Sequence, residues 1–339
     1  MQREVYRVIQ PGSLSGLKRR SESFEQPKDN EISVRIRAIG LNFADVFSVY
    51  GMYSATPKEP FIPGLEFAGT VIEVGNDCKT FRKGDEIFGT TRFGAYATHI
   101  NIDERYVFPL PKDWSHRAGA AYPVQALTAY YALHVLGDLQ SKQTILVHSA
   151  AGGVGLYANQ IAKKQNAYTI ALIGSEAKIK TIQDAGYDDF IIRGPNFRKD
   201  LEEKLNGKRL DLVLECTGGR YFSDSFDLLS PMGRLITYGS ANFTPRSSSR
   251  NWIHLAFQYL NRPKIDPLAM ISANKSVMGF NLIWLWNEID VLQKHFNALN
   301  ALKLYQQVIG DTFSFENLPE ALKKFKNGNT IGKIIIDVS

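Results

Sequence analysis

The N-terminal third of the chain shows the two-residue alternation of β-strands. Residues 31–39 read EISVRIRAI, so apolar side chains fall on one face of a strand and charged or polar ones on the other. Short apolar runs bounded by glycine or proline follow at residues 67–75, 85–89 and 94–102. This pattern predicts a compact, barrel-like β-rich domain over residues 31–110.

From about residue 123 the pattern changes to alternating strands and helices. Val154, Ala158, Ile161 and Ala162 recur at helical spacing and define one apolar face. Apolar runs typical of buried strands lie at residues 144–149, 168–173, 189–193, 210–217, 234–239 and 276–282. Six such strands with helices between them predict an α/β doubly wound parallel sheet, the Rossmann arrangement.

The C-terminal segment predicts one more helix and one more strand. Leu318, Ala321, Leu322 and Phe325 form an apolar helical stripe that ends near Gly328. Residues 331–338 read IGKIIIDV, and we expect this strand to return to the first domain.

The length of 339 residues allows two domains. The expected boundaries place residues 1–122 and 297–339 in the β-rich domain and residues 123–296 in the Rossmann domain.

Composition and charge are those of an ordinary globular protein. The chain is 44% hydrophobic and 22% charged, with a formal net charge of +6. The basic segment at residues 17–20, LKRR, is interpreted as a solvated loop and not as a nucleic-acid site. No apolar run reaches the roughly 20 residues of a membrane helix, and the first residues lack a signal-peptide pattern. With only Cys78 and Cys216 present, a cytoplasmic location is expected.

One apolar segment has several interpretations. Residues 251–263 read NWIHLAFQYLNRP and are rich in aromatic side chains. The segment is consistent with a substrate entrance, a contact for a lipid-like molecule, or a dimer interface. The favoured interpretation is a helix that packs in the core or at an interface.

A glycine-rich turn follows the first predicted parallel strand. Residues 148–155 read HSAAGGVG and contain the spacing Ala150-x-Gly152-x-x-Gly155. At a strand-to-helix turn this spacing lets a dinucleotide pyrophosphate approach the backbone and meet the N–H groups of the helix N-terminus. The turn therefore predicts a dinucleotide site.

The end of the next strand favours NADP(H) over NAD(H). NAD-specific sites usually carry an acidic residue there, about 20 residues after the glycines. This chain has Gly174 and Ser175, followed by Lys178, so hydrogen-bond donors can face a 2′-phosphate. Glu176 lies close by and argues in the opposite direction.

Six stretches resemble the medium-chain dehydrogenase/reductase superfamily, and more narrowly its zinc-free quinone oxidoreductase branch: GLNFADVF, PGLEFAGTVIEVG, GDEIFG, GAYATH, ALTAYYAL and HSAAGGVG. Later stretches, among them YGSANF and KIDPLAM, are similar to the vesicle amine transport protein-like subgroup. The resemblance implies a GroES-like catalytic domain interrupted by a Rossmann domain, bound NADP(H) and a homodimer.

The resemblance also implies the site residues. Asn42 and Tyr53 would lie by the nicotinamide and the substrate as catalytic residues, although Tyr53 is equally consistent with a packing role. Relatives often have tyrosine where this chain has Phe47 and Arg193, and Arg193 would add a phosphate donor. The cofactor contacts would come from Thr128, Ser149, Ala151, Gly152, Gly153, Val154, Gly174, Ser175, Lys178, Arg193, Thr217, Gly239, Ser240, Phe280 and Leu282.

No metal is expected. Zinc-dependent members carry a cysteine and a histidine where this chain has Asn42 and Leu65, and Glu66 is interpreted as a structural carboxylate. The expected function is hydride transfer from NADPH to quinones or α,β-unsaturated carbonyl compounds, which accept hydride without a Lewis acid. The alternative is a nucleotide-binding, membrane-associated adaptor with little turnover and no stable membrane insertion.

Overall fold

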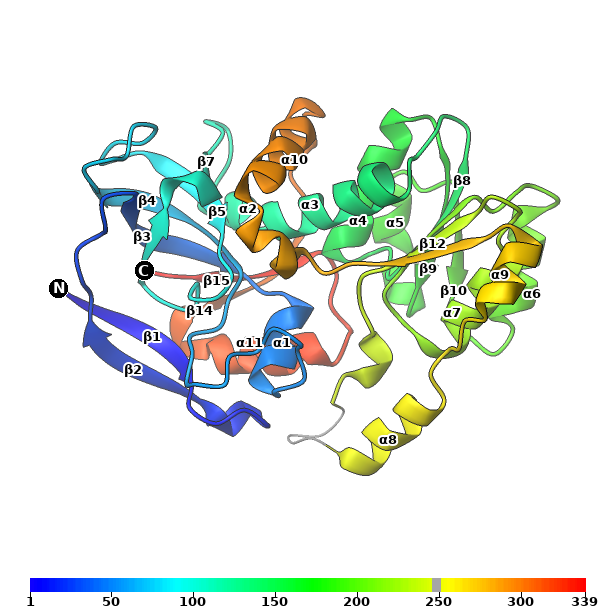
Figure 1. Cartoon of the computed structure of the whole chain (residues 1–339), viewed down its shortest axis with the longest axis horizontal. Helices are drawn as coiled ribbons and strands as arrows, with labels where there is room; N and C mark the ends of the chain where they lie inside the picture. Colours follow the sequence, from blue (N-terminus) through cyan, green and yellow to red (C-terminus); the bar gives the residue numbers. More distant parts are fainter. Residues whose placement is uncertain (246–250) are drawn as a thin grey trace.

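The computed structural model describes residues 1–245 and 251–339. Figure 1 shows two bodies side by side. One contains both the N-terminal and the C-terminal segments, and the other contains the middle of the chain. This arrangement confirms the predicted fold class, a GroES-like β domain joined to a Rossmann domain.

The sheet of the first body combines strands from both ends of the sequence. Its order is β14-β15-β3-β4-β5-β7, and β6 also pairs with β3. The C-terminal strand β15 lies antiparallel to β3, so the expected return of this strand to the first domain is confirmed. The strands are β3 (Glu31–Gly40), β4 (Glu66–Val74), β5 (Glu86–Thr90), β6 (His99–Asp103), β7 (Val107–Pro109), β14 (Ile309–Ser314) and β15 (Lys333–Asp337).

Two details of the first body differ from the predictions. The segment 94–102 was expected to be one strand, but β6 begins only at His99. The basic segment 17–20 is not a loop: it belongs to β2 (Leu17–Ser23), which pairs with β1 (Gln2–Val8) in an antiparallel ribbon. Its charged side chains are exposed, and Arg19 pairs with Glu4 across the ribbon, so β2 has no apolar run that would predict a strand.

The sheet of the second body has the predicted six parallel strands in the order β10-β9-β8-β11-β12-β13. Ile145 and Val147 face one buried cluster and Leu146 faces another, so both faces are covered. This explains the uninterrupted apolar runs. The strands are β8 (Thr144–His148), β9 (Tyr168–Ile173), β10 (Asp189–Ile192), β11 (Leu212–Glu215), β12 (Arg234–Thr237) and β13 (Ser276–Gly279).

Helices separate these strands and join the two bodies. The strand connections use α4 (Gly153–Lys164), α5 (Ile179–Asp184), α6 (Phe197–Leu205) and α7 (Gly219–Leu228). The predicted C-terminal helix is α11 (Leu318–Lys326), whose apolar stripe is buried apart from a half-buried Phe325. Further helices are α1 (Phe43–Val49), α2 (His116–Ala120), α3 (Pro123–Tyr130), α9 (Pro267–Ala273) and α10 (Ile289–Ala301).

The apolar segment 251–263 forms helix α8 (Trp252–Leu260) as expected, but the helix does not pack in the core. None of its residues is buried, and Ile253 is 85% exposed. Figure 1 shows α8 projecting away from both bodies. Within the described parts of the chain, no helix has the length and hydrophobicity needed to cross a bilayer.

Candidate cofactor and substrate site

A cavity of about 910 Å³ lies between the two bodies and takes residues from both. It is within the usual size range of small-molecule sites. Almost all of the predicted site residues line it, namely Asn42, Tyr53, Thr128, Ser149, Ala151, Gly152, Gly153, Val154, Gly174, Ser175, Lys178, Arg193, Gly239, Ser240, Phe280 and Leu282.

Thr217 is the exception. It lines an adjoining hollow, which shares Arg193, Ala241 and Asn242 with the main cavity. The turn that carries Thr217 is held by the buried carboxylate of Glu215, which accepts from the backbone N–H of Thr217 at 2.6 Å. Because the two share these lining residues, the hollow extends the cavity beyond Arg193.

The glycine turn brings backbone N–H groups to the cavity. Ser149 has a positive φ of 52°, which turns the chain sharply between β8 and α4. A Cβ on Gly155 would collide with the backbone of Ala150, so glycine is required for this close packing. Helix α4 begins at Gly153, and its first-turn N–H groups have no partners within the helix. The turn is a suitable anion site.

Cations gather beside this turn. Gly174 has no side chain where the guanidinium of Arg193 passes: a Cβ there would be 2.5 Å from its Nη2. Of the described residues that line the cavity, four are cationic (Lys178, Arg193, Lys326 and Lys333) and none is acidic. Glu176, whose negative charge would disfavour NADP(H), does not line the cavity.

Lys178 links the Rossmann domain to the C-terminal segment. Its Nζ donates to the carbonyl oxygen of Gly328 at 2.9 Å. Burial and the nearby Arg193 lower the pKa of Lys178. A second link lies close by, where the N–H of Gly332 donates to the carbonyl of Ala151 at 2.9 Å. The segment 327–332 therefore runs along the end of the cavity that contains the glycine turn, and both links tie this C-terminal segment to the Rossmann body.

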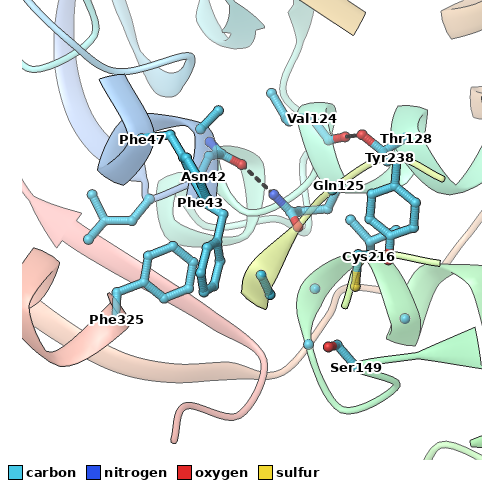
Figure 2. Close-up of a pocket in the computed structure, with 18 of the residues that line it drawn as sticks. Asn42, Phe43, Phe47, Val124, Gln125, Thr128, Ser149, Cys216, Tyr238 and Phe325 are labelled. Carbon is cyan, nitrogen blue, oxygen red and sulfur yellow. Dashed lines mark hydrogen bonds between the residues drawn. The ribbon is translucent and has the colours of Figure 1, made fainter. Parts of the chain in front are cut away.

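At the other end of the cavity, the side-chain amide of Asn42 is fully used. Its Oδ1 accepts from Gln125 Nε2 at 2.5 Å and from Lys333 Nζ at 3.0 Å. Its Nδ2 donates to Glu66 Oε1 at 2.9 Å and to the carbonyl of Gly40 at 3.2 Å. An amide makes about four such bonds, so Asn42 has no donor left for a substrate. Figure 2 shows the hydrogen bond between Asn42 and Gln125, which both line the cavity.

Ionisable groups behind Asn42 are buried together. Lys333 also forms a short ion pair with Glu66, and both are almost completely buried. Burial lowers the pKa of Lys333, although Glu66 opposes the shift. Burial raises the pKa of Asp45 to about 7, against hydrogen bonds from the Asn42 N–H and the Tyr96 hydroxyl. The wall of the site is therefore a buried polar network.

Tyr53 makes a contact between the two bodies. Its hydroxyl donates to Asn281 Oδ1 at 2.7 Å, and burial raises its pKa to about 12. Thr128, another predicted site residue, donates its hydroxyl to the carbonyl of Val124 at 2.6 Å (Figure 2). Sequence reasoning missed Gln125, Lys333 and Asn281 as parts of the site. The only available signal was the position of Asn281 between two predicted cofactor contacts.

Many of the other side chains at this end are apolar. Phe43 and Phe325 contact each other with ring centroids 4.8 Å apart, and Figure 2 shows both at the cavity wall. Phe47, Met52, Leu65, Ile283 and Trp286 also belong to the lining. This surface fits a hydrophobic ligand.

Asn42 and Leu65 stand where the resemblance implied the zinc ligands of metal-dependent relatives, and neither is a cysteine or a histidine. Glu66, next to Leu65, is taken up by Lys333, by the Asn42 amide and by the N–H of Val124. Among the described residues, no group of three or more His, Cys, Asp or Glu side chains is placed to hold a metal ion.

Two family models match the chain. The alcohol dehydrogenase GroES-like domain matches residues 28–112, and the zinc-binding dehydrogenase domain matches residues 153–281.

Individual relatives agree with these matches. The chain is 32% identical to the synaptic vesicle membrane protein VAT-1 homolog of Danio rerio, over 91% of this chain and 64% of that protein. The Homo sapiens homolog is 31% identical over 91% and 79%. Homo sapiens quinone oxidoreductase is 29% identical over 97% and 96%. The crystal structure of human VAT-1 homolog-like protein superimposes with a TM-score of 0.83 at 25% identity, over 100% and 99% of the two chains.

The fold and these matches define an oxidoreductase-type protein of two domains. The chain belongs to the medium-chain dehydrogenase/reductase superfamily, in the branch that contains the quinone oxidoreductases and the VAT-1 homologues. The chain spans slightly less than two thirds of the Danio rerio relative's length.

Proposed function

We propose that the protein is an NADPH-dependent reductase that transfers hydride to quinones or α,β-unsaturated carbonyl compounds without zinc. The observation that carries the proposal is the single cavity between the domains. It joins a glycine turn and cations at one end to an apolar, aromatic acceptor pocket at the other. Relatives named quinone oxidoreductase support the reaction class.

The residues present fit a dinucleotide. The pyrophosphate would lie on the N–H groups of Gly153 and Val154 at the start of α4. Gly152 has no side chain that would project toward it, and an added Cβ there would also lie 3.1 Å from the Ser149 carbonyl. The nicotinamide end would then reach Phe280 and Leu282, beside the acceptor pocket. When bound, the cofactor supplies the hydride.

The cation pair favours the phosphorylated dinucleotide. Ser175, Lys178 and Arg193 would surround a 2′-phosphate, and the acid that normally binds the ribose hydroxyls of NAD is missing at Gly174. Lys178 has three N–H donors and uses one on Gly328, so it can bind phosphate while keeping this contact. The contact between Lys178 and Gly328 and the binding of the phosphate would then support each other.

The absence of soft ligands at Asn42 and Leu65 suits an acceptor that delocalises its own charge. A conjugated carbonyl spreads the charge left by hydride onto its oxygen, so it needs only hydrogen bonds and a dry pocket. Leu65, Ile283 and Phe325 exclude water there.

The direct test is NADPH oxidation by the purified protein, after treatment with EDTA, with a panel of small quinones and enones. We expect turnover that does not depend on added zinc, and elemental analysis should find no stoichiometric zinc. Activity that is lost with EDTA and restored by zinc would contradict the proposal. So would the absence of turnover with every acceptor while NADPH still binds.

A second candidate function is favoured by helix α8. Its exposed apolar residues, among them Trp252, Ile253 and Leu260, form the kind of surface that binds a membrane or a partner. If the protein binds NADPH but reduces no acceptor, we propose a nucleotide-binding adaptor instead. Sedimentation with anionic liposomes tests this, and Ile253→Glu should abolish the binding.

We also propose the boundaries of the two domains. The catalytic domain consists of residues 1–122 and 297–339, and the Rossmann domain consists of residues 123–296.

We further propose that the protein is a homodimer. Strand β13 ends the Rossmann sheet and has no neighbour on its outer side among the described residues. A strand edge can pair with its own copy across a two-fold axis. Light scattering after size-exclusion chromatography should give twice the 38.1 kDa chain mass; a monomer at micromolar concentration would contradict this.

A further inference from the structure

We propose that Asn281 is a catalytic residue, whose side-chain amide donates a hydrogen bond to the carbonyl oxygen of the acceptor. This inference rests on the proposed function, because it assigns a donor to the same hydride transfer. Asn281 is the second residue after the end of β13 and lines the cavity between Phe280 and Leu282. It lies opposite Tyr53, on the acceptor side of the cavity.

Two donors fix which way the amide of Asn281 is turned. Its Oδ1 accepts from the Tyr53 hydroxyl at 2.7 Å and from the backbone N–H of Ile283 at 3.3 Å. A backbone N–H can only donate, so the atom that faces it is the amide oxygen. The two N–H donors on Nδ2 are therefore directed elsewhere, and no hydrogen bond takes them up within the described part of the chain.

The neighbouring side chains are fixed by their own contacts. Ile283 is buried and forms a small apolar cluster with Ala55 and Leu65 of the catalytic domain. The cluster holds the start of the 3₁₀ helix Leu282–Asn287 against that domain. Asn281 caps this helix, so its side chain is held at both its oxygen and its backbone. A donor with so little freedom is preorganised, which is the property that makes charge stabilisation effective.

Three other polar side chains at this end have their donors engaged. Asn42 gives both amide hydrogens to Glu66 and Gly40, and Thr128 gives its hydroxyl hydrogen to Val124. Tyr53 gives its hydrogen to Asn281, so it acts as a positioning residue and not as the proton donor. Its raised pKa, about 12, keeps that hydrogen in place at neutral pH.

In the proposed hydride transfer, NADPH supplies both electrons. Hydride adds to the β-carbon of an enone, and the electrons of the C=C bond move to leave the negative charge on the carbonyl oxygen. The Nδ2 donors of Asn281 stabilise this enolate, and a proton from water then adds to the α-carbon. The acceptor gains two electrons and two hydrogens, and NADPH leaves as NADP⁺.

The first test compares Asn281→Asp with Asn281→Ala. Aspartate still accepts from Tyr53 and still caps the helix, but it has no N–H to donate. We expect Asn281→Asp to lower kcat by about 10²–10³-fold, the usual loss for one oxyanion donor. The Kd for NADPH and the unfolding midpoint should stay near wild type. Asn281→Ala should lose similar activity with some stability. Turnover of Asn281→Asp within threefold of wild type would overturn the proposal.

Asn287→Ala is the matched control, because Asn287 ends the same 3₁₀ helix and is exposed outside the cavity. It should turn over like wild type. A double-mutant cycle separates positioning from catalysis: Tyr53→Phe alone should lower kcat roughly tenfold or less, and should have no further effect in the Asn281→Ala background. Additive losses would mean that Tyr53 does not act through Asn281.

A readout without turnover keeps this inference distinct from the proposed function. Infrared spectra of carbonyl-¹³C cyclohexanone, saturating the complex with NADP⁺, should show a carbonyl band shifted to lower frequency by the hydrogen bond. The shift should disappear in Asn281→Asp. If wild type reduces no acceptor, the reductase proposal fails and this spectrum alone decides Asn281. The same band in both proteins would overturn the role of Asn281.

Discussion

The two ends of the cavity present their hydrogen-bonding groups in different ways. At the end with the glycine turn, where we propose that the cofactor phosphates bind (the phosphate end), the start of α4, Lys178 and Arg193 line the cavity. At the opposite end, where we propose that the substrate binds (the acceptor end), Asn42 and Lys333 bind to each other and to Glu66. The phosphate end is thus built to bind a charged ligand, whereas the acceptor end is built to hold its own shape and to leave few donors for the substrate.

This difference explains why the type of a residue alone does not show whether it can bind a ligand. Asn42 is polar, lines the cavity and was expected to be catalytic, yet its amide is already saturated. Lys178 is an ordinary surface residue type, yet its ammonium group lies in the cavity with donors to spare. What a polar residue can do for a ligand depends on which of its bonds the protein has already used.

The largest expected effect comes from breaking the buried pair at the acceptor end. Lys333→Met leaves the carboxylate of Glu66 buried beside Asn42 without its cation. Removing one partner of a buried pair typically costs about 3–5 kcal/mol. We expect the free energy of unfolding to fall by that amount in urea titrations at pH 7.

Lys324→Met is the control for this prediction. Lys324 pairs with Asp311 at 2.6 Å on the surface, where an ion pair is worth at most about 1 kcal/mol. If the free energy of unfolding falls by the same small amount in both variants, the buried polar network does not stabilise the acceptor end.

A second prediction uses the buried carboxyl of Asp45. Its pKa is raised to about 7, far above the unfolded value near 3.8, because of burial. The folded state therefore binds more protons between these values, and the protein loses stability as pH rises through this window. Asp45→Asn keeps the contacts to Asn42 and Tyr96 without the charge. Its stability relative to wild type should rise from pH 4 to pH 8, by up to about 4 kcal/mol.

Chemical denaturation of both proteins at several pH values measures this difference. The comparison with wild type cancels the titration of groups that the two proteins share. A difference that stays constant with pH would show that Asp45 is ionised in the folded protein at all these values.

The phosphate end gives a smaller and more selective effect. A charge-assisted hydrogen bond is worth about 1.5–3 kcal/mol, or one to two decades of affinity. Lys178→Ala should therefore weaken NADPH binding by about 10- to 100-fold and leave NADH binding nearly unchanged. Fluorescence titration with each nucleotide measures both constants.

Lys180→Ala is the matched control, because Lys180 lies two residues away, is exposed and pairs with Asp184. It should change neither constant. Equal losses for NADPH and NADH in Lys178→Ala would mean that Lys178 acts through its contact with Gly328 and not through the 2′-phosphate.

The sequence predicted the Rossmann sheet almost strand by strand, because a strand buried on both faces needs an uninterrupted apolar run. The β1–β2 ribbon had no such signal, since its charged face is solvated and its pairing depends on contacts such as Arg19 with Glu4. Helix α8 was predicted as a helix in the core or at an interface, and the structure excludes only the core, because an apolar pattern does not say which partner covers it.

The residues of the candidate site also fall into a group that the sequence predicts and a group that it does not. The glycine turn and Lys178 are local features, so their spacing could be read directly. The partners at the acceptor end are distant in the chain: Lys333 is 291 positions from Asn42, and Asn281 is 228 positions from Tyr53. No local pattern contains such a pair, and only the folded chain brings these residues together.

The most direct measurement follows the hydride itself. Purified protein is given NADPH that carries deuterium at the transferred position of the nicotinamide, together with a conjugated enone that the panel identifies as a substrate. We expect one deuterium at the β-carbon of the reduced product, together with a slower rate than with unlabelled NADPH when the hydride step limits turnover. Product that carries no deuterium from the cofactor, or NADPH that binds tightly without reducing any acceptor, would contradict it.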